Sequence, residues 1–426
     1  MAAFSRRWLL KVVAAAGGLT GFPARFSFMN FSSTNILKQA DDLGATTKLK
    51  TKPHIAVIGA GAFGGWTALY LLRRGARVTL LDAWGPGNSR ASSGGETRVI
   101  RGTYGPNQPY TKMAARATQL WKENQTRWNM KLIRQTGVLW MVTAGDDHFE
   151  RESLPVLRDA GIDYRELSVQ EMAARWPQIN LDGVHWGIYE PEGGFLTARV
   201  ACQAVLDGFL EEGGEYRQAA VAPRGLDGGK WDKLTLSDGS NLTADQYVFA
   251  CGPWLGKLFP ETVGNHIRAT KQDVFFFGAP GGDTRFNENT MPVWADHRDR
   301  FIYGIPGNAG RGFKVADDTR GPEFDPTSGE RTVSPEGLKI IRDYIALRFP
   351  PLKDAPLLET RVCQYENSPD NNFIIDRHPG RENVWLLGGG SGHGFKHGPA
   401  LGEMVAELVL DHKDPDALFR MARFQK

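Results

Sequence analysis

The stretch HIAVIGAGAFGGWTALYLLRRGARVTLLDAW, residues 54–84, decides the fold of this chain. An apolar run breaks into a glycine-rich turn, continues as a helix-forming segment, and returns to a second apolar run that ends in Asp82. This order predicts a strand, a glycine turn, a helix, a second strand and an acid. It is the pattern of a dinucleotide-binding unit.

Each glycine of the turn has a physical reason to be there. Gly59 permits the tight turn, Gly61 lets the backbone approach a pyrophosphate, and Gly64 lets the helix pack closely on the strand. Asp82 follows Gly64 by 18 residues, where it would accept from ribose hydroxyls and repel a 2′-phosphate. The stretch does not distinguish NAD from FAD, and a turn with only a packing role remains the alternative.

Composition indicates a globular protein with more than one core. The chain has 426 residues, 41% hydrophobic residues and a formal net charge of +3. Two domains are the natural expectation at this length, and the small charge gives no reason to expect a nucleic-acid partner. Cys202, Cys251 and Cys363 are widely separated, so they predict neither a disulfide framework nor a metal site.

The N-terminus is typical of a targeting signal. Residues 5–11 read SRRWLLK, a twin-arginine pair followed by apolar residues and a lysine, and the mildly apolar VVAAAGGLTG follows. That apolar part is about ten residues, whereas about 20 are needed to span a bilayer. We therefore expect a twin-arginine signal over residues 1–30, a polar linker over 31–52, no stable membrane span in the mature chain, and a periplasmic or extracytoplasmic location. A basic tail or short anchor is the alternative, and a chain whose signal does not function would stay cytoplasmic.

The rest of the chain alternates between helical and strand-like segments. We expect a loop over 85–105 and helices over 109–130, 146–161, 165–178, 197–212, 335–348 and 398–411. We expect strands over 137–143, 247–254 and 384–387, the second of which ends in a glycine turn. The segment 268–350 is otherwise strand-like and aromatic. A strand, a glycine loop and a helix thus recur at the far end of the chain. The dinucleotide domain is therefore predicted from three segments, 53–105, 195–265 and 360–426, and a second domain from 106–194 and 266–359.

Several motifs along the chain resemble those of one enzyme family. They are IGAGAFG with Asp82, ETRVIR (96–101), CGPW (251–254), IYGIPG (302–307), GFK (312–314), CQYENSPDNNFIID (363–376) and GGGSGHGFKHGP (388–399). They follow one another as in the monomeric sarcosine oxidase and N-methyltryptophan oxidase family, to which the fructosyl amino acid oxidases are also related. The resemblance covers nearly all of residues 54–411. It implies FAD, an α/β flavin domain of the glutathione-reductase type with Rossmann-like FAD binding, and an α+β substrate domain whose sheet is largely antiparallel.

The resemblance implies that FAD is covalently attached through Cys363. In that family a cysteine at this position bonds the flavin 8α-methyl carbon. A thiolate is the required nucleophile, and the arginine in the flanking TRVCQY favours it. Cys202 and Cys251 are interpreted as buried and inert.

Arg101 and Lys396 match the family's pair that holds the substrate carboxylate. A guanidinium grips a carboxylate through two hydrogen bonds, and a lysine adds a point charge. The alternative is that both are surface cations or bind a flavin phosphate. Arg98 is interpreted as a flavin neighbour, and Thr97 as a hydrogen-bonding group near the ring.

Three further positions matter for the reaction itself. Lys314 matches the family's oxygen-activating lysine, where a fixed cation stabilises developing negative charge, and Tyr303 matches a tyrosine that closes the substrate cavity. At the position of Asp318 sarcosine oxidase has a histidine and the fructosyl amino acid oxidases have an acid. Asp318 is therefore a candidate partner for a substrate amine or sugar hydroxyl. If the match is displaced by one residue, Asp317 takes this role instead. The structural alternatives are a turn carboxylate for Asp318, a core tyrosine for Tyr303 and a solvated strand lysine for Lys314.

The C-terminal glycine loop matches the family's last flavin contact. Gly390, Gly392, His393 and Gly394 are the candidates, and a helix N-terminus there would stabilise negative charge on a reduced flavin. His393 is interpreted as part of the loop. HGFKH has two histidines but no third ligand within sequence reach, so no metal is expected.

These observations predict a monomeric, exported FAD-dependent oxidase of an amino acid or secondary amine. It would pass electrons to O2, yield hydrogen peroxide, and produce an imine that hydrolyses to a carbonyl. Its partners would be a small-molecule amine, O2 and the twin-arginine export machinery. The alternatives are a dehydrogenase that reduces a quinone or periplasmic carrier, a catalytically silent flavin-binding protein, and an NAD-dependent dehydrogenase. The last leaves Cys363 and the C-terminal block without a role.

Overall fold

The computed structural model of the protein describes residues 52–143, 145–221 and 231–425. The predicted export signal and residues 31–51 of the predicted linker lie outside the described residues. Within the described part, no helix is both long and apolar enough to cross a bilayer.

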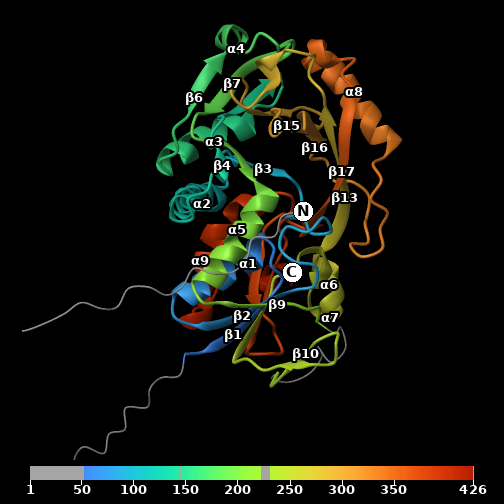
Figure 1. Cartoon of the computed structure of the whole chain (residues 1–426). Helices are drawn as coiled ribbons and strands as arrows, with labels where there is room; N and C mark the ends of the chain where they lie inside the picture. The colour runs from blue at the N-terminus through green and yellow to red at the C-terminus, as the bar shows by residue number, and fades with distance from the viewer. Residues whose placement is uncertain (1–51, 144, 222–230, 426) are drawn as a thin grey trace, which may run out of the picture. The chain divides into compact units, whose positions relative to one another are not determined.

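A six-stranded sheet forms the floor of the described unit (Figure 1). In spatial order its strands are β18 (Ile374–Arg377), β19 (Val384–Gly388), β12 (Gln246–Phe249), β1 (His54–Ile58), β2 (Arg77–Asp82) and β9 (Glu215–Gln218). Five of them run parallel, and β18 is antiparallel to β19. Because the sheet combines strands from both ends of the chain, its core forms only when distant segments meet.

The strands of this sheet are apolar on both faces. Ile55 and Val57 of β1 face one core, which includes Trp66 of α1, whereas Ala56 and Ile58 face a second core. A parallel sheet covered on both sides requires such continuous apolar runs. The prediction of a buried strand at the apolar run around residue 55 is therefore confirmed.

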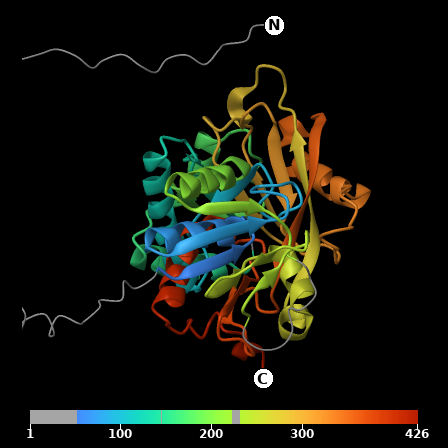
Figure 2. The ribbon, with the colours of Figure 1, turned by 60° about the horizontal axis from the view of Figure 1, so that its bottom comes forward.

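Helices cover the first of these faces. They are α1 (Ala62–Arg73), α5 (Ala198–Glu211), α9 (Gly398–Leu410) and α2 (Gln108–Arg127). α9 packs directly against α1, so the red C-terminal helix and the blue N-terminal helix lie side by side in Figures 1 and 2. The contact is close because Gly402 faces the backbone of Trp66, where an added Cβ would lie 2.6 Å from the carbonyl carbon.

An eight-stranded sheet forms the other half of the described unit (Figure 1). Its order is β17 (Leu357–Asn367), β13 (Arg268–Phe277), β16 (Phe313–Asp317), β15 (Phe301–Ile305), β14 (Val293–His297), β5 (Val138–Thr143), β7 (Val184–Glu190) and β6 (Arg165–Ser168). All neighbours are antiparallel except β14 and β5. α8 (Pro335–Arg348) packs on one face of this sheet through Ile341 and Ile345.

Shorter elements complete the described part. They are α3 (His148–Asp159), α4 (Val169–Arg175), α6 (Leu255–Leu258), α7 (Pro260–Val263), the sheet β3 (Thr97–Ile100), β8 (Gly194–Thr197) and β4 (Ile133–Arg134), and the hairpin β10 (Leu234–Thr235) and β11 (Asn241–Leu242).

Most predicted helices are present within a few residues, and two local predictions are wrong. Residues 85–105 are not all loop, because β3 pairs with β8 within them. Residues 165–178 begin as strand β6 before α4 starts. The segment 247–254, expected as a strand that ends in a glycine turn, is strand β12 up to Phe249, and Gly252 has a φ of +53° at the start of a short 3-10 helix over Gly252–Trp254.

The two sheets clarify the predicted domain segments. Every strand of the six-stranded sheet lies in one of the three segments expected for the dinucleotide domain. The boundary between residues 359 and 360, however, falls inside β17, which belongs to the eight-stranded sheet over its whole length. The strand that carries Cys363 is therefore part of the antiparallel sheet.

Candidate functional site

The glycine turn after β1 is as tight as its sequence predicts. Gly59 has a φ of +107°, and a Cβ there would meet the carbonyl oxygen of Ala250 at 2.3 Å. A Cβ on Gly64 would lie 1.9 Å from the carbonyl oxygen of Gly59. Side chains at either position would push α1 away from β1.

Gly61 stands at the start of α1 and keeps that helix end open. A Cβ there would touch only the Ser93 hydroxyl, at 3.4 Å. Gly61 has no side chain to cap the helix, its first turn contains no acid, and the uncharged Ser93 hydroxyl accepts from the Ala62 N–H at 3.1 Å. The partial positive charge of the helix N-terminus is therefore not neutralised by the helix's own side chains, which suits an anionic ligand.

Asp82 ties the glycine turn to the end of β2. Its Oδ2 accepts from the Ala60 N–H at 2.8 Å, and its Oδ1 accepts from the N–H groups of Trp84 and Gly85 at 2.9 Å each. Burial raises the pKa of this carboxyl. The carboxylate thus holds the turn in place, in addition to the ribose contact that its position predicts.

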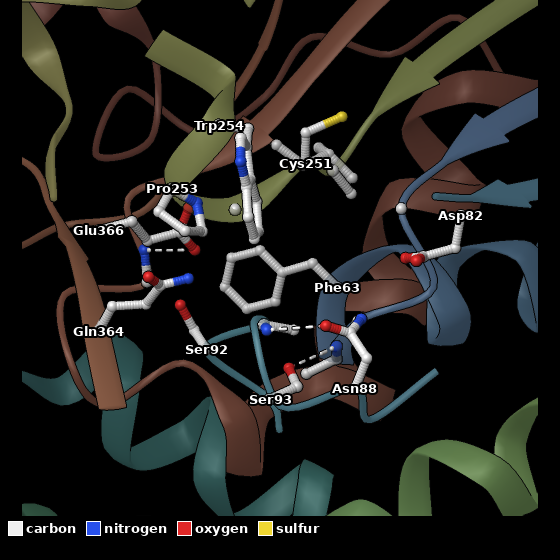
Figure 3. A pocket seen from close by; sticks show the side chains of 18 of the residues that line it. Phe63, Asp82, Asn88, Ser92, Ser93, Cys251, Pro253, Trp254, Gln364 and Glu366 are labelled. Atoms are coloured by element: carbon white, nitrogen blue, oxygen red, sulfur yellow. Dashed lines mark hydrogen bonds between the residues drawn. The ribbon is translucent and has the colours of Figure 1, made fainter. Parts of the chain in front are cut away.

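A long cavity opens on the glycine turn; we call it the cofactor cavity. Figure 3 shows Gln364 and Glu366 on one side of it and Asp82 on the other, with Phe63 and Trp254 between them. Its lining comes from segments far apart in the chain and includes Gly59, Gly61, Asp82, Asn88, Ser92, Ser93, Arg98, Cys251, Pro253, Trp254, Gln364, Tyr365, Glu366, Gly390, Gly392 and Gly394.

A second, smaller cavity adjoins the first; we call it the substrate cavity. The two share Arg98, Tyr365, Gly392 and Phe395 as walls. The substrate cavity is lined in addition by Val99, Arg101, Val138, Val293, Trp294, Ala295, Phe301, Tyr303, Asp318, His393 and Lys396. Four residues that the sequence singles out, Arg101, Tyr303, Asp318 and Lys396, therefore meet around one space.

The register of the eight-stranded sheet brings the reactive side chains of its strands to one face. Lys314 pairs with Phe276, and Tyr303 pairs with Ala316. Cross-strand partners share a face, and Phe276, Ala316, Tyr303 and Cys363 pack in one cluster. The opposite face carries the core beneath α8.

Lys314 is buried, with 3% of its surface exposed. Its Nζ donates to the Thr97 carbonyl at 3.1 Å and lies 3.5 Å from the Thr97 hydroxyl. Burial, and then the neighbouring Arg98, lower the pKa of Lys314 to about 7. Thr97 and Lys314 do not line either cavity in its present form; they form a pair just behind Arg98.

Cys363 contacts Arg98 directly. The Arg98 Nη2 lies 3.3 Å from the Cys363 Sγ and also donates to the Ser92 carbonyl. A guanidinium at this distance stabilises a thiolate, which is the form that reacts as a nucleophile. Cys202 is buried as expected, whereas Cys251 is partly exposed and lines the cofactor cavity, so its interpretation as a buried residue is wrong. Desolvation of the thiol raises the pKa of Cys202 to about 12 and also raises that of Cys251.

Arg101 lies between two aromatic rings. Its guanidinium carbon is 4.7 Å from the Tyr104 ring centroid and 4.8 Å from that of Trp140, and Nη1 donates to the Thr103 carbonyl. Stacking leaves the edge of a guanidinium free for a carboxylate.

Lys396 is held by the loop that precedes α9. It is 4% exposed, and its Nζ donates to the Tyr104 hydroxyl at 2.7 Å and to the His393 carbonyl at 2.9 Å. Burial, and then Arg101, hold the pKa of Lys396 well below its usual range.

Of the two neighbouring acids, Asp318 faces the substrate cavity. Its Oδ1 accepts from the Tyr365 hydroxyl at 2.6 Å, and Arg320 lies 3.5 Å from Oδ2. Burial raises the pKa of Asp318. Asp317 instead pairs with Arg300, so Asp318 is the acid at the site.

The C-terminal glycine loop lies where both cavities meet. An added Cβ would strike the Tyr365 ring at 2.6 Å from Gly392 and the Phe63 ring at 2.9 Å from Gly394. His393 lines the substrate cavity, and burial together with Lys396 lowers its pKa to about 3. The histidine is therefore neutral, in agreement with its interpretation as a loop residue.

Sequence reasoning missed two residues in these walls and one directly behind them. Tyr104 is held by Lys396, Tyr365 lines both cavities, and Glu366 is a buried carboxyl whose Oε2 has no hydrogen-bond partner within the described part of the chain. Tyr365 and Glu366 directly follow Cys363 and Gln364, so the alternation of β17 would have placed Tyr365 on the same face as Cys363. No sequence signal could have identified Glu366, because a buried glutamate and an exposed one look alike in the sequence.

The family model for DAO, an FAD-dependent oxidoreductase, matches residues 54–408. The chain belongs to the DAO family of FAD-dependent oxidoreductases. It is 28% identical over 369 residues to a monomeric sarcosine oxidase of Bacillus sp. (strain NS-129), covering 86% of this chain and 95% of that protein. It is 27% identical over 387 residues to N-methyl-L-tryptophan oxidase of Salmonella enteritidis PT4, covering 88% and 100% respectively.

The fold is that of a solved DAO-type enzyme. L-proline dehydrogenase from P. horikoshii superposes with a TM-score of 0.76 at 22% identity, covering 88% of this chain and 98% of that protein. The predicted combination of an α/β flavin domain with a largely antiparallel substrate domain is confirmed.

The residues of the cofactor cavity fit FAD. At one end stands a helix N-terminus without a first-turn acid, which suits a pyrophosphate. Glu366 follows Tyr365, one of the residues that both cavities share, and its Oε2 is buried without a hydrogen-bond partner in the described residues. A polar atom of a ligand could bond to this oxygen. In the described ranges no group of three metal-ligating side chains occurs.

Proposed function

We propose that the protein oxidises an amine that carries a carboxylate, with O2 as the electron acceptor and hydrogen peroxide as a product. The observation that carries this proposal is the substrate cavity, where Arg101, Lys396 and Asp318 meet beside the cofactor cavity. Bound FAD would supply the two-electron acceptor for the amine. Names of the relatives support an amine substrate, since two of them are oxidases of N-methylated amino acids.

In this proposal Arg101 and Lys396 bind the substrate carboxylate. The Arg101 guanidinium would donate to the carboxylate through the N–H groups that the Thr103 carbonyl does not engage, and Lys396, which lines the same cavity, adds a second charge. Tyr303 contributes an aromatic wall that excludes water, and the Trp140 ring supports Arg101 from outside the cavity lining. Asp318 lies on the same cavity and would interact with the amine end of the substrate.

Cys363 is the proposed covalent attachment site. Arg98 supplies the nearby positive charge that a thiolate needs. Denaturing gels of purified wild type would retain flavin fluorescence, and the intact mass would exceed that of the apoprotein by one FAD. A Cys363→Ala variant that still retained flavin after denaturation would refute the assignment.

The function is tested by an anaerobic screen of carboxylate-bearing amines for bleaching of the flavin absorbance, followed by peroxide detection in air. N-methyl amino acids, primary L-amino acids and sugar-amine adducts form the panel, with the matching amines that lack a carboxylate as controls. We expect bleaching only with the carboxylates. If no amine bleaches the flavin, the proposed oxidase activity is wrong, and the alternative of a flavin-binding protein without catalytic activity is favoured.

One observation favours a dehydrogenase as the second candidate. Lys314 donates to Thr97 and has a pKa of about 7, so its charge near neutral pH is only partial. Reoxidation in air decides between the two: an oxidase reoxidises rapidly, and Lys314→Met slows it, whereas a dehydrogenase reoxidises slowly with or without that change.

The proposed location is extracytoplasmic. The twin arginines Arg6 and Arg7 support export, and cell fractionation of the wild type and an Arg6→Lys, Arg7→Lys variant tests it. The variant is expected to accumulate in the cytoplasm.

A further inference from the structure

The amine of Lys396 is buried among uncharged partners. Its two acceptors are the Tyr104 hydroxyl at 2.7 Å and the His393 carbonyl at 2.9 Å. The carboxylates that act on it through space are engaged elsewhere. Asp318 accepts from Tyr365, and Glu190 accepts from the Thr103 hydroxyl at 2.6 Å.

Tyr104 is oriented to accept from Lys396 and to donate to a histidine. The Tyr104 Oη lies 2.7 Å from the His397 Nε2 and 3.3 Å from the His393 Nδ1. The His393 Nε2 lies 3.0 Å from the Asn371 carbonyl, so this nitrogen carries the proton and Nδ1 is an acceptor. The single hydroxyl proton of Tyr104 therefore points to a histidine, and its lone pairs face Lys396.

A second cation shares the Tyr104 ring with Lys396. The Arg101 guanidinium carbon lies 4.7 Å and the Lys396 Nζ 5.1 Å from the ring centroid. Arginine stays charged at any ordinary pH, so the repulsion falls on the lysine. The titratable and charged groups that face this amine are Arg101, Tyr104, Glu190, Asp318, His393 and His397. Both histidines have pKa values below their usual range and are neutral.

An uncharged lysine fits these contacts. A neutral amine has two N–H donors and one lone pair, and Lys396 has two acceptors on the protein side. The remaining position is available to a ligand in the substrate cavity, which Lys396 lines. The lone pair can therefore receive a proton from that ligand.

We propose that Lys396 is the base that removes a proton from the substrate's ammonium group as the carboxylate docks. The inference rests on the proposed function and extends it. One N–H bond of the ammonium group breaks, one N–H bond forms at the Lys396 Nζ, and no electrons are gained or lost. The products are a substrate with a neutral amine and a charged Lys396 paired with the carboxylate.

Two electrostatic effects act in the direction of this transfer. A carboxylate placed beside Lys396 and Arg101 favours the charged form of the lysine. Burial disfavours the charged form of the substrate amine. A neutral amine is also the form that readily loses a hydride equivalent. One residue would thus couple binding of the carboxylate to activation of the amine.

The test uses two ligands that cannot be oxidised, 2-aminoisobutyrate and 2-hydroxyisobutyrate. Neither has a hydrogen on the carbon that bears nitrogen or oxygen, and they differ only in that group. Calorimetric titration of the holoenzyme at about pH 8, in two buffers of different ionisation enthalpy, counts the protons exchanged. We expect the enzyme to take up about one proton from solvent for each hydroxy acid that binds. For the amino acid we expect about none, because its ammonium group supplies the proton to Lys396.

Two variants identify the group that takes the proton. Lys396→Arg is permanently charged, so it should bind the hydroxy acid without proton uptake. Asp318→Asn should keep the uptake, which excludes the other buried acid of the cavity. The inference is overturned if the wild type binds the hydroxy acid without uptake, if uptake persists in Lys396→Arg, or if it disappears in Asp318→Asn. If neither ligand binds the wild type, the carboxylate site itself is wrong and the proposed function falls with the inference.

Discussion

Single residues at the two cavities owe their charge states to burial. Lys314 and Lys396 have lowered pKa values, whereas Asp318 and Glu366 have raised ones, and burial is the largest cause in each case. Titratable groups shifted in this way gather where a ligand replaces water. Burial thus shifts each of these groups towards its neutral form, and the pKa values of Lys314 and Glu366 come to lie at about 7 and about 8.

Glu366 gives a pH-dependent test of this environment. Burial raises its pKa to about 8, only partly offset by the Gly390 N–H. The folded state then binds the proton more tightly than the unfolded state, so stability falls as pH rises from the ordinary glutamate pKa towards 8. Glu366→Gln, which is neutral throughout, should raise the thermal midpoint at pH 9 by about 3 °C more than at pH 6. An equal effect at both values would show that Glu366 is ionised in the folded protein.

A buried ion pair beneath the eight-stranded sheet gives a second test at this scale. Arg348 and Asp296 have fully buried side chains with 2.9 Å between Nη2 and Oδ2, and the Tyr344 hydroxyl also donates to Asp296 at 2.9 Å. Removing the arginine leaves the buried carboxylate with only Arg298 as a counter-charge, at 3.3 Å from Oδ1 and with a side chain that is 30% exposed. Arg348→Met should lower stability by about 3–5 kcal/mol, measured by urea denaturation.

The control for that variant is Lys339→Met. Lys339 pairs with Asp343 on the solvent side of α8, with side chains 69% and 67% exposed. Solvent screens such a pair, so no measurable change is expected. Equal effects of the two changes would contradict the account of Arg348.

Among the elements, β1, its glycine turn and α1 control the cofactor cavity. The turn brings the N-terminus of α1 to the cavity and lets the helix lie directly on the sheet. The packing of α9 on α1 then brings the second glycine loop to the same cavity. One close contact thus positions two of the cavity's walls.

Gly64→Ala should displace α1 and weaken FAD binding. The new Cβ would lie 1.9 Å from the carbonyl oxygen of Gly59, which is backbone and cannot move aside. Purified protein should contain at least tenfold less flavin per chain, as measured by the ratio of absorbance at 450 and 280 nm, about the ratio that a loss of 1.4 kcal/mol in binding gives.

Gly281→Ala is the matched control for this change. A Cβ at Gly281 would meet nothing within 4 Å, and its φ lies outside the left-handed region. Its flavin content should equal that of the wild type. Normal flavin content in Gly64→Ala would mean that the turn tolerates a wider spacing than the structure has.

In the described molecule as a whole, the cavities join two sheets with separate cores. The six-stranded sheet contributes the glycine turn, and β17 of the eight-stranded sheet contributes Gln364, Tyr365 and Glu366. A ligand that fills the cofactor cavity contacts both. Its binding should therefore stabilise the two halves together.

This predicts a difference between FAD and its ADP portion. In flavin-free Cys363→Ala protein, added FAD should raise the thermal midpoint, with about 1.4 kcal/mol of stability for each tenfold increase above the dissociation constant. ADP reaches only the glycine-turn end, so it should raise the midpoint less at equal concentration. Equal effects of FAD and ADP would show that the wall from β17 contributes nothing to binding.

The sequence by itself determined the parts that depend on neighbours along the chain. The turn at Gly59, Gly61 and Gly64 and the acid after β2 follow from local backbone geometry, so the strand-turn-helix-strand unit could be predicted. The helix over 335–348 also matches α8, because its Ser334 cap and its Pro335 are local signals. The strands β3 and β6 could not be predicted, because they depend on pairing with β8 and β7, which follow them at a distance in the chain.

Only the tertiary structure decided which side chains face one another. It placed Asp318 at the substrate cavity and turned Asp317 towards Arg300, and it put Cys363 beside Arg98. It also buried Glu366 and Lys396, and no local pattern in the sequence predicts the shifts that burial gives to their pKa values. The physical reason is that burial and electrostatic environment come from segments hundreds of residues apart, brought together only when the two sheets pack.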